Sequence, residues 1–196
     1  MSRARSIRAV MHGVVASFCV AAAAPGAEPF RLTEWPAGAP NPAFHLIDWN
    51  HERRSLEDYR GRVAVVLFGF THCPDVCPGE LLKLAQAVKR LGPLAAQVQV
   101  LFVTLDPERD SPELLKSYVA WFDPRFVALT GSTAAINAAA DSFSVQFAKV
   151  PEGKDYAIDH STGIYAFDKK GRLRLVGSMA TSADDWVHDL AILAGG

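Results

Sequence analysis

Residues 63–78 read VAVVLFGFTHCPDVCP, an apolar run followed directly by two cysteines. An uninterrupted apolar run of this length is typical of a strand buried on both faces of a sheet. After the cysteines, Leu81, Leu84 and Val88 recur every three or four residues and predict the apolar stripe of a helix. The cysteines therefore lie between a central strand and the helix that follows it, which is where open α/β sheets bind ligands.

The spacing of the two cysteines suggests their chemistry. Three residues separate Cys73 from Cys77, whereas two are usual in thioredoxin-type redox pairs. Residues four apart lie on the same side of a helical turn, so the two sulfurs can form a disulfide or converge on one soft metal ion. Two thiolates suit Cu(I), and an added imidazole makes Cu(II) workable as well. The positive end of the helix is expected to lower the pKa values of both thiols.

Three other uses of the cysteine pair stay open. A purely structural disulfide would close a very small loop, which constrains the unfolded chain little. A zinc site needs two more ligands, and the sequence has no paired His or Cys motif to supply them. A peroxide-reducing cysteine would stand alone in a proline-rich loop with a Thr shortly before it; Thr71 fits that pattern, but Cys73 has Cys77 beside it.

His160 is the expected third ligand. It lies just before a predicted strand, on a turn that would face the cysteine loop in an α/β fold of the thioredoxin type. Taken alone, a His beside an acidic residue such as Asp159 is more often a surface residue. His72 adjoins Cys73 and could tune it electrostatically or simply pack locally. The histidines expected to be structural or solvated are His45, His51 and His188.

Strand and helix patterns alternate through the rest of the chain. Such an alternation, ended by a hairpin and a helix, predicts an α/β core with mixed strand directions, and this order fits a thioredoxin-like fold with an added N-terminal β-hairpin. Serines are expected to cap the later helices. Beyond the first strand and helix, the predicted strands span residues 98–105, 125–129, 144–150, 163–167 and 173–176, the N-terminal hairpin spans 44–56, and helices begin at Ser111, Ser132 or Thr133, and Ser182.

The chain of 196 residues divides into three parts. Residues 1–27 have a basic start, an apolar stretch and small residues at the end, the order of a secretory signal peptide. An uncleaved membrane anchor is the alternative, although the apolar run is shorter than the roughly 20 residues that span a bilayer. The proline-rich residues 28–43 are expected to be an extended linker. Residues 44–196 are expected to form one copper-binding domain.

Composition and export narrow the function classes. The chain is 49% hydrophobic and 21% charged with a net charge of −1, which suits a globular core and gives no sign of a nucleic-acid partner. Export to the periplasm, or to the outer face of the cytoplasmic membrane, would remove Cys19 with the signal peptide. Cys73 and Cys77 would then be a disulfide, a redox pair or a metal site in an oxidising compartment. A monomer is expected, since no long exposed apolar stretch is evident.

Four strings of the sequence resemble those of the Sco/SenC family. Any one of them could be chance, but four in the right order make the resemblance specific, and it covers roughly residues 44–190. The strings are FGFTHCPDVCP (68–78), TLDPERDSPELLKSY (104–118), FVALTGS (126–132) and DYAIDHSTGIYAFDKKG (155–171).

The resemblance implies a function as well as a fold. It implies copper, as Cu(I), Cu(II) or both, bound by Cys73, Cys77 and His160. The family is implicated in delivering copper to the dinuclear copper centre of cytochrome c oxidase, so the expected partner is the copper-bearing oxidase subunit or another cuproprotein. Some members resemble thiol–disulfide oxidoreductases. Cys73 and Cys77 could instead be a redox-active pair, a disulfide when oxidised, that keeps client cysteines reduced with electrons from a thioredoxin-like reductant.

Several charged residues are expected to support the ligands. Asp106, Arg109 and Asp110 follow the second predicted strand, close to the cysteine loop. They could orient a ligand or a partner, or form a helix-capping and ion-pairing corner; both interpretations stay open. Asp159 and His72, which adjoin expected ligands, belong to the same supporting set.

The segment that leads to His160 is expected to be mobile without metal. Its turn formers and charges at residues 151–153 offer few anchors. Copper would then tie this late segment to the cysteine loop.

Overall fold

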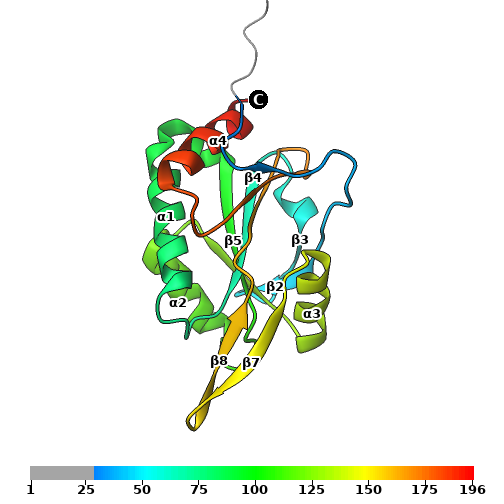
Figure 1. The fold of residues 1–196 in the computed structure, drawn as a ribbon, viewed down its shortest axis with the longest axis vertical. Coiled ribbons are helices and arrows are strands. Elements are labelled where there is room, and N and C mark those ends of the chain that lie inside the picture. The colour runs from blue at the N-terminus through cyan, green and yellow to red at the C-terminus, as the bar shows by residue number, and fades with distance from the viewer. Residues whose placement is uncertain (1–28) are drawn as a thin grey trace, which may run out of the picture.

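The computed structural model describes residues 29–196 (Figure 1). The expected signal peptide or membrane anchor, residues 1–27, lies outside the described residues, as does Cys19. The helices are α1 (Val76–Arg90), α2 (Pro112–Phe122), α3 (Thr133–Ser142) and α4 (Ala183–Gly195), with short 3-10 helices at Leu56–Tyr59 and Gly92–Gln97. The strands are β1 (Thr33–Glu34), β2 (His45–Asp48), β3 (Arg53–Ser55), β4 (Val63–Gly69), β5 (Val98–Thr104), β6 (Val127–Thr130), β7 (Phe147–Glu152), β8 (Asp155–His160), β9 (Ile164–Phe167) and β10 (Leu173–Gly177).

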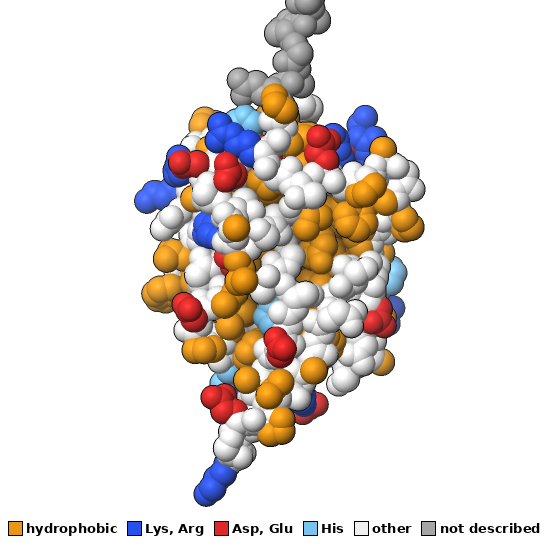
Figure 2. Space-filling model, viewed as in Figure 1, with side chains coloured by type: hydrophobic (Ala, Val, Ile, Leu, Met, Phe, Trp, Pro, Cys, Tyr) orange, Lys and Arg blue, Asp and Glu red, His pale blue; other side chains and the backbone are white. Residues whose placement is uncertain are grey.

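A mixed sheet forms the centre of the molecule. Eight strands lie in the order β1-β10-β9-β4-β5-β6-β2-β3, with β4, β5 and β6 parallel to one another and β9 antiparallel to β4. Helices α1, α2 and α4 lie on one side of the sheet and α3 on the other (Figure 1). On the face shown in Figure 2, acidic and basic side chains are interspersed and apolar ones occur in several groups.

The predicted central strand is buried on both faces. Every residue of β4 is buried, and its side chains alternate between two apolar clusters. Val65 and Leu67 pack with α1 and α4, whereas Val66 and Phe68 pack with α3. In the register of the sheet, Gly69 lies opposite Thr104 at the carboxyl ends of β4 and β5. The cysteine loop and the loop after β5 therefore leave the sheet side by side.

The serine caps occur as predicted. The Ser111 side chain accepts a hydrogen bond from the backbone N–H of Leu114, three residues into α2. Ser132 caps α3 in the same way, and Ser182 forms a capping box with Asp185 at the start of α4. These caps satisfy backbone donors that would otherwise have no partner, so the helix starts are set locally.

The segment expected to be a linker runs along the domain over residues 29–43. Its β1 pairs with β10, and Leu32 is buried. The carboxylate of Asp189 in α4 accepts hydrogen bonds from the backbone N–H groups of Arg31 and Leu32, at 3.0 and 2.8 Å. Asn41 accepts a hydrogen bond from the backbone N–H of Leu173. The edge strand β10 and the buried Asp189 both gain the partners that they need from this segment.

Two pairs of consecutive strands run antiparallel. Strand β2 pairs antiparallel with β3 and, along its other side, with β6. Strand β9 pairs antiparallel with β10. The segment expected to form the N-terminal hairpin therefore extends the main sheet at one edge.

A third hairpin was not predicted from the sequence. Strands β7 and β8 pair antiparallel from Phe147 opposite His160 to Glu152 opposite Asp155, forming a two-stranded ribbon separate from the main sheet. We call these residues, 147–160, the ribbon. It projects from the end of the molecule opposite to α4 (Figure 1). The sequence predicts only the first strand and the turn. In the structure, His160 ends a strand instead of lying on a loop.

Candidate metal centre

The cysteine loop carries both thiols at the start of α1. Cys77 lies in the first turn of the helix, and its backbone N–H donates a hydrogen bond to the sulfur of Cys73 at 3.3 Å. The Cys73 sulfur thus lies at the positive end of the helix, where negative charge is favoured. Both cysteines are free thiols, Cys73 half-buried and Cys77 only 3% exposed. The pair is therefore asymmetric, with one sulfur reachable from solvent.

Burial changes the chemistry expected of Cys77. It raises the pKa of the Cys77 thiol well above the ordinary value, and the contact with Cys73 raises it further. The prediction that the helix end lowers the pKa of both thiols is therefore wrong for Cys77. Loss of solvation outweighs the helix end because the sulfur is enclosed by apolar side chains. At neutral pH the metal-free Cys77 carries its proton.

Gly69 allows this enclosure. A Cβ atom at residue 69 would lie 2.9 Å from the Cys77 sulfur and 2.8 Å from a ring carbon of Phe102. Both distances are far shorter than a normal van der Waals contact, so any larger residue would push Cys77 out of its place. Gly69 thus sets the space available to Cys77, a role that was not predicted from the sequence.

His160 faces the buried thiol from the end of β8. Its Nε2 atom lies 3.7 Å from the sulfur of Cys77, and its Nδ1 atom lies 2.8 Å from the backbone carbonyl oxygen of Ser161. A carbonyl oxygen only accepts hydrogen bonds, so Nδ1 carries the hydrogen and the lone pair of Nε2 points toward Cys77. The ring also packs edge-on against Phe70, with ring centroids 6.1 Å apart. This tautomer is the one that can bind a metal through Nε2.

The three donors lie near one another without forming a finished site. Within residues 29–196, no group of three or more His, Cys, Asp or Glu side chains is arranged to hold a metal ion. Cys77 is in contact with both Cys73 and His160, so it links the other two donors. A small, mainly apolar pocket adjoins Cys77 and His160, with Thr162 and Glu80 among its walls. Cys73 and His160 are both half-buried, whereas Cys77 is enclosed.

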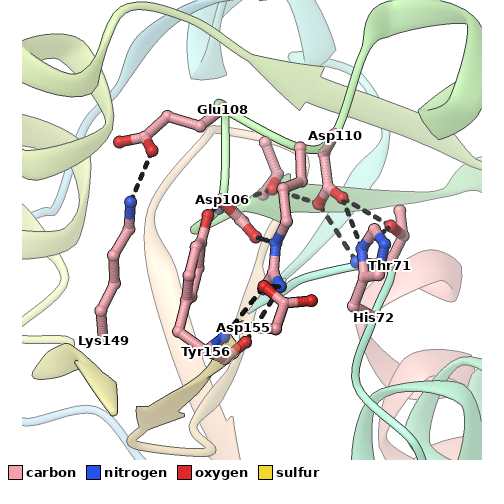
Figure 3. Close-up of polar contacts among 10 residues, drawn as sticks. Thr71, His72, Asp106, Glu108, Asp110, Lys149, Asp155 and Tyr156 are labelled. Carbon is pink, nitrogen blue, oxygen red and sulfur yellow. Dashed lines mark hydrogen bonds and ion pairs between the residues drawn. The ribbon is translucent and has the colours of Figure 1, made fainter. Parts of the chain in front are cut away.

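Asp110 fastens the cysteine loop to the end of β5 (Figure 3). Its buried carboxylate accepts hydrogen bonds from the Thr71 hydroxyl at 2.5 Å, the Thr71 backbone N–H at 3.1 Å and the Thr104 hydroxyl at 2.6 Å. The exposed His72 lies at the edge of this group, with Nδ1 3.8 Å from Asp110 and 3.1 Å from the Thr71 hydroxyl. Asp110 therefore positions the residue that lies two before Cys73.

Asp106 and Arg109 fasten the ribbon instead. The guanidinium of Arg109 donates to the Asp106 carboxylate, to the Asp155 carboxylate at 3.0 Å and to the backbone carbonyl of Tyr156 at 2.9 Å. The Tyr156 hydroxyl donates to Asp106 at 2.8 Å, and its ring lies against the guanidinium at 3.7 Å. We call Asp106, Arg109 and Tyr156 the clasp. The ribbon thus has anchors that the sequence analysis did not expect.

The helix-capping part of the interpretation of the charged corner is wrong, whereas its role in orienting a ligand stays a prediction. Ser111 caps α2, so Asp106, Arg109 and Asp110 are not helix caps. They form an ion-pairing corner that touches both the cysteine loop and the ribbon. Tyr156, the residue through which this corner reaches the ribbon, was missed by the sequence analysis. Its signal was the alternation of Tyr156, Ile158 and His160.

The remaining candidates lie farther from the sulfurs. Asp159 is exposed and, by the alternation of strand β8, projects from the face opposite to that of His160. His45 lies in β2 and His51 in the turn that follows it. The Nδ1 atom of His188 in α4 lies 2.6 Å from Asp189, at the end of the molecule away from the ribbon.

Comparison with known proteins agrees with this architecture. Residues 35–195 match the family model described as SCO1/SenC. The chain belongs to the SCO1/SenC family. It is 45% identical over 132 residues to the human mitochondrial SCO2 homolog, a match that covers 65% of this chain and 50% of the relative. The chain therefore spans about half the length of that relative.

Solved structures of SCO1/SenC proteins have the same fold. Copper-bound ScoI from Bradyrhizobium japonicum is 33% identical, with a TM-score of 0.72 over 79% of this chain and 99% of that one. Apo Sco1 from Thermus thermophilus is 35% identical, with a TM-score of 0.75 over 84% of this chain and 97% of that one. The predicted α/β, thioredoxin-like fold is confirmed.

Proposed function

We propose that this protein binds copper through Cys73, Cys77 and His160 and delivers it to the dinuclear copper centre of cytochrome c oxidase during assembly. The observation that carries the proposal is the approach of the His160 Nε2 lone pair to the buried Cys77 sulfur. Two thiols and one imidazole are a soft donor set that suits Cu(I) and accepts Cu(II). The similarity to a copper-bound ScoI structure supports the same assignment.

The asymmetry of the thiols suggests how copper enters and leaves. Cys73 is the sulfur nearer to solvent, so it meets incoming copper first and is the first to be exchanged for a ligand of the recipient. Cys77 lies deeper, in contact with His160, and holds the ion against loss to water. Copper binding requires the thiolate of Cys77, so its proton has to leave.

Copper loading of residues 29–196 tests this proposal. We expect one ion per chain and thiolate-to-Cu(II) charge-transfer absorption that disappears in the Cys73→Ala, Cys77→Ala and His160→Ala variants. His45→Ala is a matched control, since His45 lies in β2, and it should load normally. Full retention of copper by His160→Ala would remove this residue from the site. Transfer is then tested by mixing the loaded protein with the reduced apo copper domain of the oxidase subunit.

A second candidate function is thiol–disulfide exchange, and the hydrogen bond from Cys77 to the Cys73 sulfur favours it. Cys73 would attack a client disulfide, forming a mixed disulfide and releasing one client thiol. Cys77 would lose its proton to solvent and attack Cys73, which releases the second client thiol and leaves a Cys73–Cys77 disulfide. A thioredoxin-like reductant would then restore the dithiol. Copper-free protein should reduce a client in this case, and His160→Ala should reduce it equally well.

The place of action is part of the proposal. We propose export, with residues 1–27 as a signal peptide or an anchor and the domain of residues 44–196 in the periplasm or on the outer membrane face. In the described part of the chain, no helix is both long and apolar enough to cross a membrane. The proposed partner is the copper-bearing oxidase subunit or another cuproprotein. We propose that this protein acts as a monomer. Cell fractionation of the full chain, with and without residues 1–27, tests the location.

A further inference from the structure

The face of β8 that carries His160 is attached to the domain along its length. Tyr156, Ile158 and His160 share this face because side chains alternate along a strand. Ile158 is buried in the same apolar cluster as Cys77. Tyr156 is bound by Asp106 and Arg109. It lies four residues before His160, which corresponds to about 13 Å along a strand. The position of Tyr156 therefore affects where His160 lies.

The clasp holds the ribbon through groups that are hard to displace. Asp106 is completely buried, and a buried carboxylate needs charged or hydrogen-bonding partners. Arg109 and Tyr156 supply them, one to each oxygen. Arg109 also donates to the backbone carbonyl of Tyr156, so the clasp fixes the main chain of β8 as well as a side chain.

One short loop holds both sides of the site. Asp106 and Asp110 belong to the same tight turn, in which the Asp110 backbone N–H donates to the Asp106 carbonyl at 2.9 Å. Asp106 faces the ribbon, and Asp110 faces the cysteine loop through Thr71 (Figure 3). The distance between cysteines and histidine is thus set by residues 106–110. The ribbon needs this anchor, because an isolated two-stranded hairpin is only marginally stable in water.

We infer that the clasp is a positioning device for His160: Asp106, Arg109 and Tyr156 hold β8 so that the imidazole meets the cysteine pair. None of the three residues contributes a donor to the copper site. The inference rests on the proposed copper function and adds residues that set the geometry of its histidine ligand.

The Tyr156→Phe variant tests the inference, because it removes one hydroxyl and keeps the ring against Arg109. Its Cu(I) affinity, measured by competition with a chelator, should fall by about 10- to 100-fold, the usual effect of removing a group that orients a metal ligand. Tyr59→Phe is the matched control, since the Tyr59 hydroxyl has no hydrogen-bond partner in the structure and lies away from the ribbon. Its affinity should equal that of the wild type.

A double-mutant cycle separates positioning from general stability. His160→Ala keeps the two thiols, so it should bind Cu(I) more weakly than the wild type, and Tyr156→Phe should cause no further loss in that background. An equal loss in both backgrounds would overturn the inference, because the effect would then not pass through His160. Wild-type affinity in Tyr156→Phe would overturn it as well.

Copper-free protein gives an independent measurement. The His160 ring packs against Phe70, so its NMR signals report its position. They should shift in Tyr156→Phe, and amides 155–160 should exchange faster, while Tyr59→Phe leaves both unchanged. Unchanged signals would overturn the inference even if the wild type binds copper. A wild type that binds no copper would instead refute the proposed function, and the NMR comparison would still decide whether the clasp positions His160.

Discussion

The Nε2 atom of His160 lies 3.7 Å from the sulfur of Cys77, although the two residues are 83 positions apart in the chain. Cys77 is placed by the junction of β4 and α1, and His160 by the end of the ribbon. The protonated Cys77 thiol can donate to the Nε2 lone pair in this arrangement, so a metal that takes both donors has to replace the thiol proton. The contact thus links metal binding to pH and to the packing of the cysteine loop.

Copper affinity should increase with pH. Burial raises the pKa of the Cys77 thiol, so the metal-free protein keeps this proton at neutral pH and copper displaces it. The apparent Cu(I) affinity should rise about tenfold per pH unit for each proton released. Competition titrations at pH 6, 7 and 8, corrected for protonation of the chelator, measure this slope. An affinity that does not change with pH would contradict a protonated Cys77.

The raised pKa of Cys77 also predicts how the stability of the metal-free protein changes at high pH. The pKa of Cys77 is higher in the folded than in the unfolded chain. The contribution of Cys77 to stability is therefore complete below the pKa of the unfolded thiol and declines as the pH rises above it. Stability should begin to fall above about pH 8.5, by up to about 1.4 kcal/mol per pH unit. Urea unfolding between pH 7 and 10 measures the decline. Cys77→Ala lacks the group and should show a shallower decline.

Gly69→Ala should disturb the buried thiol. The added methyl would overlap the Cys77 sulfur and the Phe102 ring, so we expect a loss of about 1–3 kcal/mol in the free energy of unfolding. Copper affinity should fall as well, because Cys77 has to move. Gly79→Ala is the control: nothing lies within 4 Å of its added methyl, and alanine favours the helix by up to about 1 kcal/mol. Equal stability of the two variants would show that the loop absorbs the methyl.

Removing the Asp110 carboxylate should loosen the cysteine loop. In Asp110→Ala, the Thr71 hydroxyl, the Thr71 backbone N–H and the Thr104 hydroxyl lose their acceptor. The free energy of unfolding should therefore fall by about 2–4 kcal/mol. Thr104→Val removes one of these donors and should cost about 1 kcal/mol. Urea unfolding measures both. If the two variants lose equal stability, Asp110 does not hold the loop through Thr71.

Local signals predicted the parts of the fold that short sequences specify. The apolar run of β4 and the serine caps at Ser111, Ser132 and Ser182 depend on neighbouring residues, and they are present as expected. Strand β8 depends on distant partners. Its charged and exposed residues suggested a loop. The strand is held by its pairing with β7, by the burial of Ile158 and by the contacts from Asp106 and Arg109.

The chemistry of the site also depends on both local sequence signals and contacts between distant residues. The helix end beside Cys77 is visible in the sequence and favours a thiolate. The enclosure that reverses this effect comes from tertiary packing, including the missing side chain at Gly69. Sequence patterns therefore suggested Cys73, Cys77 and His160 as donors, whereas the protonation of Cys77 and the contacts of Tyr156 required the folded structure.

The two thiols should react with alkylating agents at very different rates. Cys73 is half-buried at the mouth of the site, whereas Cys77 is 3% exposed and keeps its proton at neutral pH. The thiolate is the reactive form, so iodoacetamide at pH 7 should modify Cys73 at least about tenfold faster than Cys77. Peptide mass spectrometry over time measures both rates in copper-free, reduced protein, and unfolding in urea should make the rates similar. Equal rates in the folded protein would mean that the cysteine loop opens readily, and the entry of copper by way of Cys73 would lose its structural basis. Preloading with Cu(I) should protect both residues, because both sulfurs are then bound, whereas a copper ion held by one cysteine would leave the other reactive.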